Sequence, residues 1–209
     1  MLRPTTVSPC TFRLRVMSDK TARELERCRA IETQAHDRVA EAKRDLASKL
    51  EREIRPRLID HAKSVTLSQP HIARKLGAQG IASLRTNLSA ALDDVLVRMR
   101  ATIQRPEWPP RTNAIGATYH GPSAGAVRDG ISDFLHGEIG NFNVVLTQRG
   151  FSVELMGGPL RLYPNELFDS ADEFTDLVDA LLFLDNAKKN TAAAQAADDH
   201  DFVSSLWDE

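Results

Sequence analysis

The chain has 209 residues, of which 42% are hydrophobic and 27% are charged, a composition typical of globular proteins. Aromatic residues make up only 6%, so the core must consist mainly of Leu, Val, Ile and Ala. No segment approaches the roughly 18 consecutive apolar residues of a membrane span. The only two cysteines, Cys10 and Cys28, are too few to hold together a secreted disulfide-rich fold. We therefore predict a cytoplasmic protein that does not enter a membrane.

Charge is divided unequally along the chain. Residues 1–111 contain 22 Lys and Arg against 13 Asp and Glu, whereas residues 112–209 contain 5 against 16. One interpretation is that the two halves attract each other, within one chain or between chains. The other is that the basic half binds nucleic acid or another acidic partner. We favour the first, because charge balance alone does not define a partner.

The first 16 residues contain three arginines, two prolines and no acidic residue. Met17, followed by Ser18 and Asp19, resembles a second translation start placed directly before a helix. We interpret residues 1–17 as a disordered tail or an over-annotated start.

A helical arm or hairpin is predicted for residues 18–105. Residues 19–55 contain no Gly or Pro, and Pro56 is expected to kink or end the first helix. Small and apolar residues recur there at steps that are mostly three or four: Leu25, Cys28, Ala35, Val39, Ala42, Leu46 and Leu50. This narrow seam is typical of a coiled coil or an antiparallel helical hairpin, so a second helix must cover it, either from another chain or from residues 81–103.

The second amphipathic helix has the most regular pattern in the sequence. Its apolar positions are Ile81, Leu84, Leu88, Leu92, Val95, Met99 and Ile103, at steps of three and four. Three prolines follow closely, so residues 106–113 are predicted to be a Pro-rich linker.

Residues 68–100 also resemble, in part, a helix-turn-helix. Gln69, Ala73 and Gly77 have the spacing of that motif's first helix, but Ser83 stands where its second helix needs an apolar residue. Arg74, Lys75 and Arg85 are the candidate nucleic-acid contacts. The alternative is an ordinary helical bend with solvated basic residues.

A small α+β part is predicted for residues 114–190. It would contain a short strand at 114–119, a helix from 124, a β-hairpin at 151–163 around Gly157 and Gly158, and a buried helix from Phe174 to Leu184. The predicted fold class is therefore mostly α, and α+β overall.

Residues 191–209 are predicted to form an acidic C-terminal helix or tail. Its apolar residues, Phe202, Val203, Leu206 and Trp207, recur at positions i, i+1, i+4 and i+5. Such a segment docks in a partner's groove or packs back on its own chain.

Ser123 is a weak candidate for a catalytic nucleophile. It lies in a Gly121-Pro-Ser-Ala-Gly125 sequence of the GxSxG type, which locally resembles the catalytic-serine segment of Lon-type Ser–Lys proteases. That family needs a lysine about forty residues further on, and none occurs between Ser123 and Lys188. Since a serine hydroxyl without a base is a poor nucleophile, we favour Ser123 as a helix N-cap.

The function predicted from these patterns is that of a non-enzymatic interaction or assembly protein. It would associate with itself through the N-terminal coiled-coil-like helix and bind another protein. A DNA-binding regulator using residues 68–100 is the alternative, and a serine hydrolase at Ser123 is a distant third. The six histidines are scattered and form no ligand pair, so we expect no metal or other cofactor.

Overall fold

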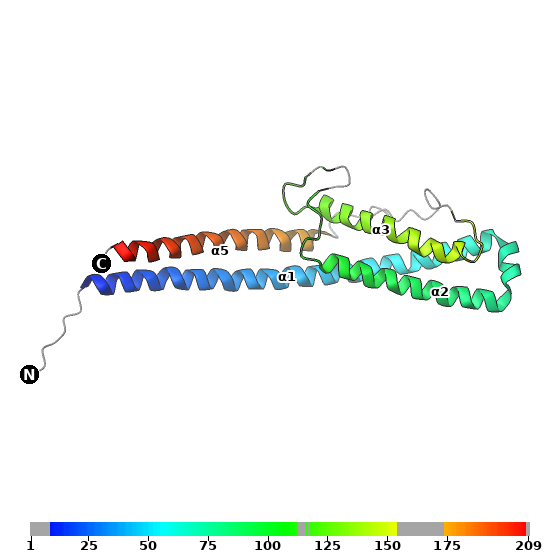
Figure 1. The fold of residues 1–209 in the computed structure, drawn as a ribbon, viewed down its shortest axis with the longest axis horizontal. Helices are drawn as coiled ribbons and strands as arrows, with labels where there is room; N and C mark the ends of the chain where they lie inside the picture. The colour runs from blue at the N-terminus through cyan, green and yellow to red at the C-terminus, as the bar shows by residue number, and fades with distance from the viewer. Residues whose placement is uncertain (1–8, 113–115, 117, 154–173, 208–209) are drawn as a thin grey trace, which may run out of the picture. The chain divides into compact units, whose positions relative to one another are not determined.

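The computed structural model describes residues 9–112, 116, 118–153 and 174–207, with side chains from residue 20 onward (Figure 1). The helices of this part are α1 (Pro9–Ser68), α2 (Pro70–Gln104), α3 (Ala124–Thr147) and α5 (Thr175–Trp207). The predicted mostly-α class is therefore confirmed. No helix among these residues has an apolar segment long enough to cross a membrane.

The chain divides into two compact units. Unit 1 comprises Met1–Val39 and Asp179–Glu209, and unit 2 comprises Ala40–Val178. The first part of α1 therefore belongs to unit 1 and its second part to unit 2.

Unit 1 is an antiparallel pair formed by the first part of α1 and by α5. Arg29 donates a hydrogen bond of 2.7 Å to the side-chain oxygen of Gln195, and the Arg38 guanidinium lies 5.8 Å from the centre of the Phe183 ring. The buried residues of the pair are small or apolar: Leu25, Cys28, Ala35 and Val39 from α1, and Ala180, Leu184 and Ala187 from α5. The N-terminal part of the α1 seam is thus covered by a C-terminal helix of the same chain, a partner that the sequence patterns did not indicate.

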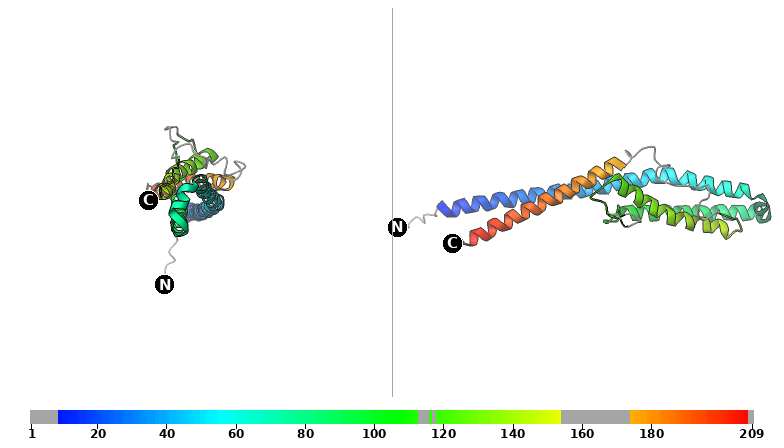
Figure 2. Two further views of the ribbon diagram at one scale, coloured as in Figure 1. Left: turned by 90° about the vertical axis from the view of Figure 1, so that its right-hand side faces the viewer. Right: turned by 90° about the horizontal axis from the view of Figure 1, so that it is seen from above.

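Unit 2 contains a bundle of α1, α2 and α3, which lie side by side in the two further views of Figure 2. Arg55 of α1 pairs with Asp93 of α2 at 2.9 Å. Arg98 of α2 makes a two-point contact with the Glu138 carboxylate of α3, at 3.0 and 2.7 Å. The core is aliphatic with one phenylalanine from these helices, and includes Leu50, Ile54, Leu58, Leu84, Val95, Met99, Ile131, Leu135, Phe142 and Leu146.

Two polar contacts are buried in unit 2. His61 Nε2 lies 2.9 Å from the Asn143 side-chain oxygen, between α1 and α3. The Lys43 ammonium donates a 2.6 Å hydrogen bond to the Arg105 carbonyl after α2 and lies 5.9 Å from the centre of a Trp108 ring. Burial lowers the pKa of Lys43, and the nearby Glu107 carboxylate opposes this effect.

Pro56 does not end the first helix. α1 continues through it to Ser68, and Pro56 itself is exposed. Proline has no N–H to donate to the carbonyl one turn earlier. The buried residues Ile54 and Leu58 on either side of it hold the chain in the bundle.

The predicted β-structure is not found in the described residues. Of the strand predicted at 114–119, residues 114, 115 and 117 lie outside the described residues, and Thr118 forms an isolated β-bridge with Thr112. Of the β-hairpin at 151–163, residues 154–163 lie outside the described residues, and residues 151–153 are not in a strand. The Phe151 amide instead donates to the Leu146 carbonyl at the end of α3, and the Ser152 amide donates to the Gln69 side chain. The amides of the first two predicted strand residues are thus engaged by the end of α3 and by Gln69.

The helix predicted to be buried from Phe174 to Leu184 is amphipathic. Phe174, Leu177, Ala180 and Leu184 are buried, but Leu182 and Phe183 are exposed. The packed face of α5 is one stripe, because a helix that pairs with one neighbour can bury only the side facing it.

Candidate functional site

An apolar groove with a volume of about 610 Å³ lies between α1 and α2 in unit 2. We name it the α1–α2 groove. Its lining residues are Arg55, Ile59, Ala62, Lys63, Thr66 and Leu67 of α1, Ala73, Ile81, Leu84, Arg85, Leu88, Ser89 and Leu92 of α2, and Phe142 of α3. Clefts of this size, mostly apolar with a few polar groups, are typical of binding sites.

A break in α2 at Gly77 shapes this end of the bundle. Gly77 has φ 64° and ψ −178°, a backbone conformation that residues with a Cβ rarely adopt. The short part of α2 before Gly77 crosses from the end of α1 toward the long part that follows (Figure 1). Because this short part separates the two long helices, their side chains do not fill the space between them.

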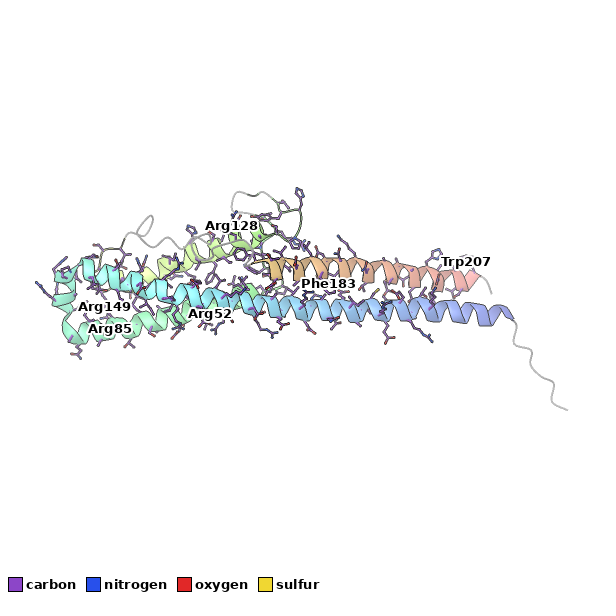
Figure 3. The ribbon with its side chains drawn as sticks, turned by 180° about the vertical axis from the view of Figure 1, so that it is seen from behind. Arg52, Arg85, Arg128, Arg149, Phe183 and Trp207 are labelled. Atoms are coloured by element: carbon purple, nitrogen blue, oxygen red, sulfur yellow. The ribbon has the colours of Figure 1, made fainter. Side chains whose placement is uncertain are left out.

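Among the described residues that line the groove, three are basic and none is acidic. Arg55 and Lys63 come from α1, and Arg85 comes from α2. Arg55 pairs with Asp93 and Lys63 with Asp60, whereas Arg85 forms no ion pair with any described residue. Arg85 lies at the same end of unit 2 as Arg149, which adds positive charge there (Figure 3). An acidic ligand is therefore favoured over a basic one.

The three predicted nucleic-acid contacts are exposed but are divided by the break in α2. Arg74 and Lys75 lie before Gly77, and Arg85 lies after it and borders the α1–α2 groove. A helix-turn-helix joins its helices by a turn of about three or four residues, whereas α2 is interrupted at Gly77 alone. Ser83 is exposed and Leu84 is buried, as expected for an ordinary amphipathic helix.

Ser123 is the N-cap of α3. Its backbone is extended, at φ −150° and ψ 153°, and its hydroxyl oxygen accepts a 3.2 Å hydrogen bond from the Ala126 amide. The predicted N-cap is confirmed, and this hydroxyl is engaged with the first turn of the helix. In the described part of the chain, no group of three or more His, Cys, Asp or Glu side chains is placed to hold a metal ion.

The four apolar residues of the C-terminal segment lie on the last two turns of α5 and are exposed. Phe202, Val203, Leu206 and Trp207 have 63%, 51%, 60% and 85% of their surface accessible. These residues belong to unit 1, whereas the α1–α2 groove belongs to unit 2.

The α1 side of the groove was missed by the sequence analysis. Ile59 and Leu67 line it and are exposed, although both are large and apolar. The sequence did contain a signal for this surface. Ile59 follows the buried Leu58, and Leu67 lies near the buried Val65, so both lie beside the periodic seam rather than on it. Apolar residues outside a satisfied seam indicate a second contact surface.

Comparison of the sequence with protein-family models, with curated proteins and with solved structures finds no match.

Proposed function

We propose that this chain is a non-enzymatic helical interaction protein that binds a helical segment of a protein partner in the α1–α2 groove. The groove itself is the observation that carries this proposal. On α1 it extends from Arg55 to Leu67, which is about 18 Å at 1.5 Å per residue. This length fits about three turns of a docked amphipathic helix, a common mode of peptide recognition.

Apolar burial supplies the affinity in this proposal, and charge supplies the selectivity. Ile59, Leu67 and Leu88 offer apolar surface that a docked helix would cover. Arg85 and its basic neighbours favour an acidic helix over a basic one, because like charges brought together at an interface reduce affinity. The α1 seam is already covered within the chain, so we place the interaction at the groove rather than at the seam.

Two designed amphipathic peptides test the proposal with the full chain. They share one apolar face, and their polar faces carry only Glu or only Lys. We expect fluorescence anisotropy to show binding of the acidic peptide, with the basic peptide weaker by about tenfold or more.

A groove-filling variant identifies the surface. Ser89 lines the groove and is exposed, so Ser89→Trp should fill it and abolish peptide binding. Val97 is exposed on the same helix and does not line the groove, so Val97→Trp is the matched control and should bind normally. Absence of binding by both peptides, or normal binding to Ser89→Trp, would contradict the proposed function.

A further inference from the structure

The last turns of α5 carry an apolar face that is exposed. Asp198, Asp201, Ser204 and Ser205 are half-buried, whereas Phe202, Val203, Leu206 and Trp207 are exposed. Figure 3 shows Trp207 at the end of α5, projecting away from α1. The polar side of this segment therefore takes part in the helix pair, and its apolar side is left to water.

Water is an unfavourable environment for a face of this size. Four large apolar side chains within six residues form a contiguous patch, and patches of this kind mark interaction sites. Their spacing at i, i+1, i+4 and i+5 is that of a helix that inserts one side into a groove.

The charges of this segment are opposite to those that border the α1–α2 groove. Asp198, Asp199 and Asp201 precede or flank the apolar face, and Asp208 and Glu209 follow it in the sequence. The described lining of the α1–α2 groove includes the basic residues Arg55, Lys63 and Arg85 and no acidic residue. One chain thus contains an acidic amphipathic helix end and a basic-edged apolar groove, and the segment of about 14 Å is short enough to fit within the groove, which is about 18 Å long.

We propose that residues 198–207 of one copy occupy the α1–α2 groove of a second copy. This inference rests on the proposed function and names its partner. The contact joins two different surfaces, so it is heterologous. It closes into a dimer when each copy inserts its segment into the other, and it forms an open chain of copies otherwise.

Analytical ultracentrifugation of the full chain over a range of micromolar concentrations measures this association. We expect species larger than the monomer. Leu206→Asp places a charge on the inserted face, and Arg85→Glu reverses the charge at the groove. Each substitution should reduce the association constant by about tenfold or more. The matched controls are Val97→Asp, at an exposed apolar residue outside the groove, and Arg74→Glu, at an exposed arginine outside it.

Mixing the two variants tests the heterologous geometry directly. The Leu206→Asp chain keeps an intact groove, and the Arg85→Glu chain keeps an intact C-terminal segment. The mixture should therefore form a complex that neither variant forms alone. Association that survives in both variants, or variants that do not complement each other, would overturn the proposal.

A monomer at every concentration would also overturn the second copy as occupant. If the acidic peptide still bound that monomer, the proposed function would stand with a different partner. Tighter peptide binding by Leu206→Asp than by the unmodified monomer would show that the segment occupies its own groove. Failure of both association and peptide binding would remove both proposals.

Discussion

Gly130 has only a hydrogen atom where other residues have a side chain, and this lets Trp108 and Pro110 pack directly against α3. A Cβ at this position of α3 would lie 2.7 Å from Pro110 Cδ and 2.8 Å from Trp108 Nε1. Trp108 is buried, and its Nε1 has no hydrogen-bond partner among the described residues. The residues after α2 thus approach α3 closely enough that only glycine fits between them.

We predict that Gly130→Ala destabilises the protein, although alanine favours helices by about 1 kcal/mol over glycine. Overpacking of this kind typically costs about 1–3 kcal/mol. Gly137 is the matched control, because it lies in the same helix and a Cβ there would meet nothing within 4 Å. Urea unfolding should therefore give a lower free energy of unfolding for Gly130→Ala than for the unmodified protein, and an equal or higher one for Gly137→Ala. Equal stability of the two variants would contradict this account of Trp108.

Lys43 gives a prediction about pH. Burial lowers its pKa in the folded state, so between that lowered pKa and the ordinary value of 10.5 the unfolded chain binds more protons than the folded one. Stability contributed by this group therefore rises with pH in that window. In Lys43→Met the ammonium is absent, and this contribution disappears.

We expect the free energy of unfolding of the unmodified protein to increase relative to that of Lys43→Met as the pH approaches 10.5. Urea titrations of both proteins at several alkaline pH values measure the difference, in which all other titrating groups cancel. A constant difference across the series would show that the folded environment does not perturb Lys43.

At the scale of elements, local pattern predicted the helices but not which helices pack together. The run from Ile81 to Ile103 lies in α2 as expected, and Ser123 caps α3, because both depend on neighbours along the chain. The cover of the α1 seam by α5 was not predictable. Arg29 and Gln195 are 166 residues apart, and sequence periodicity carries no information about so distant a partner.

The candidate site was predictable only in part. The apolar residues and acidic character of 198–207 were recognised from the sequence, and the structure places the apolar ones on an exposed face. The α1–α2 groove was not recognised, because it depends on the backbone conformation of Gly77 and on which side of α1 faces α2. Alternation at 151–153 suggested a strand, but the Phe151 amide donates to the Leu146 carbonyl at the end of α3 and the Ser152 amide donates to the distant Gln69 side chain.

At the scale of the whole molecule, the division of charge along the sequence largely disappears in the units. Over the full sequence, unit 2 contains 17 basic and 17 acidic residues, and unit 1 contains 10 and 12. Each unit combines parts of the basic first half with parts of the acidic second half, as in the pair Arg98 and Glu138. This arrangement supports the interpretation that the two halves attract each other within the chain.

We therefore predict that the full chain binds a random-sequence DNA duplex weakly at low salt and not measurably at moderate salt. Binding to phosphates by a few exposed side chains such as Arg74 and Lys75 falls steeply with salt, because it depends on counterion release. Anisotropy titrations at two salt concentrations measure this dependence. Tight binding at moderate salt that is lost in Arg74→Glu with Lys75→Glu would instead favour the DNA-binding function.

The His61–Asn143 contact has a consequence for how α1 and α3 align. Apolar burial is non-directional, so it depends less on the exact position of each atom than a hydrogen bond does. A hydrogen bond is more demanding: a shift of one helical turn, about 5.4 Å, would separate the His61 and Asn143 side chains inside the core. Each would then lack a partner, at a cost of about 1–3 kcal/mol. This buried polar pair therefore favours one longitudinal alignment of α1 along α3 over alignments that differ by a helical turn.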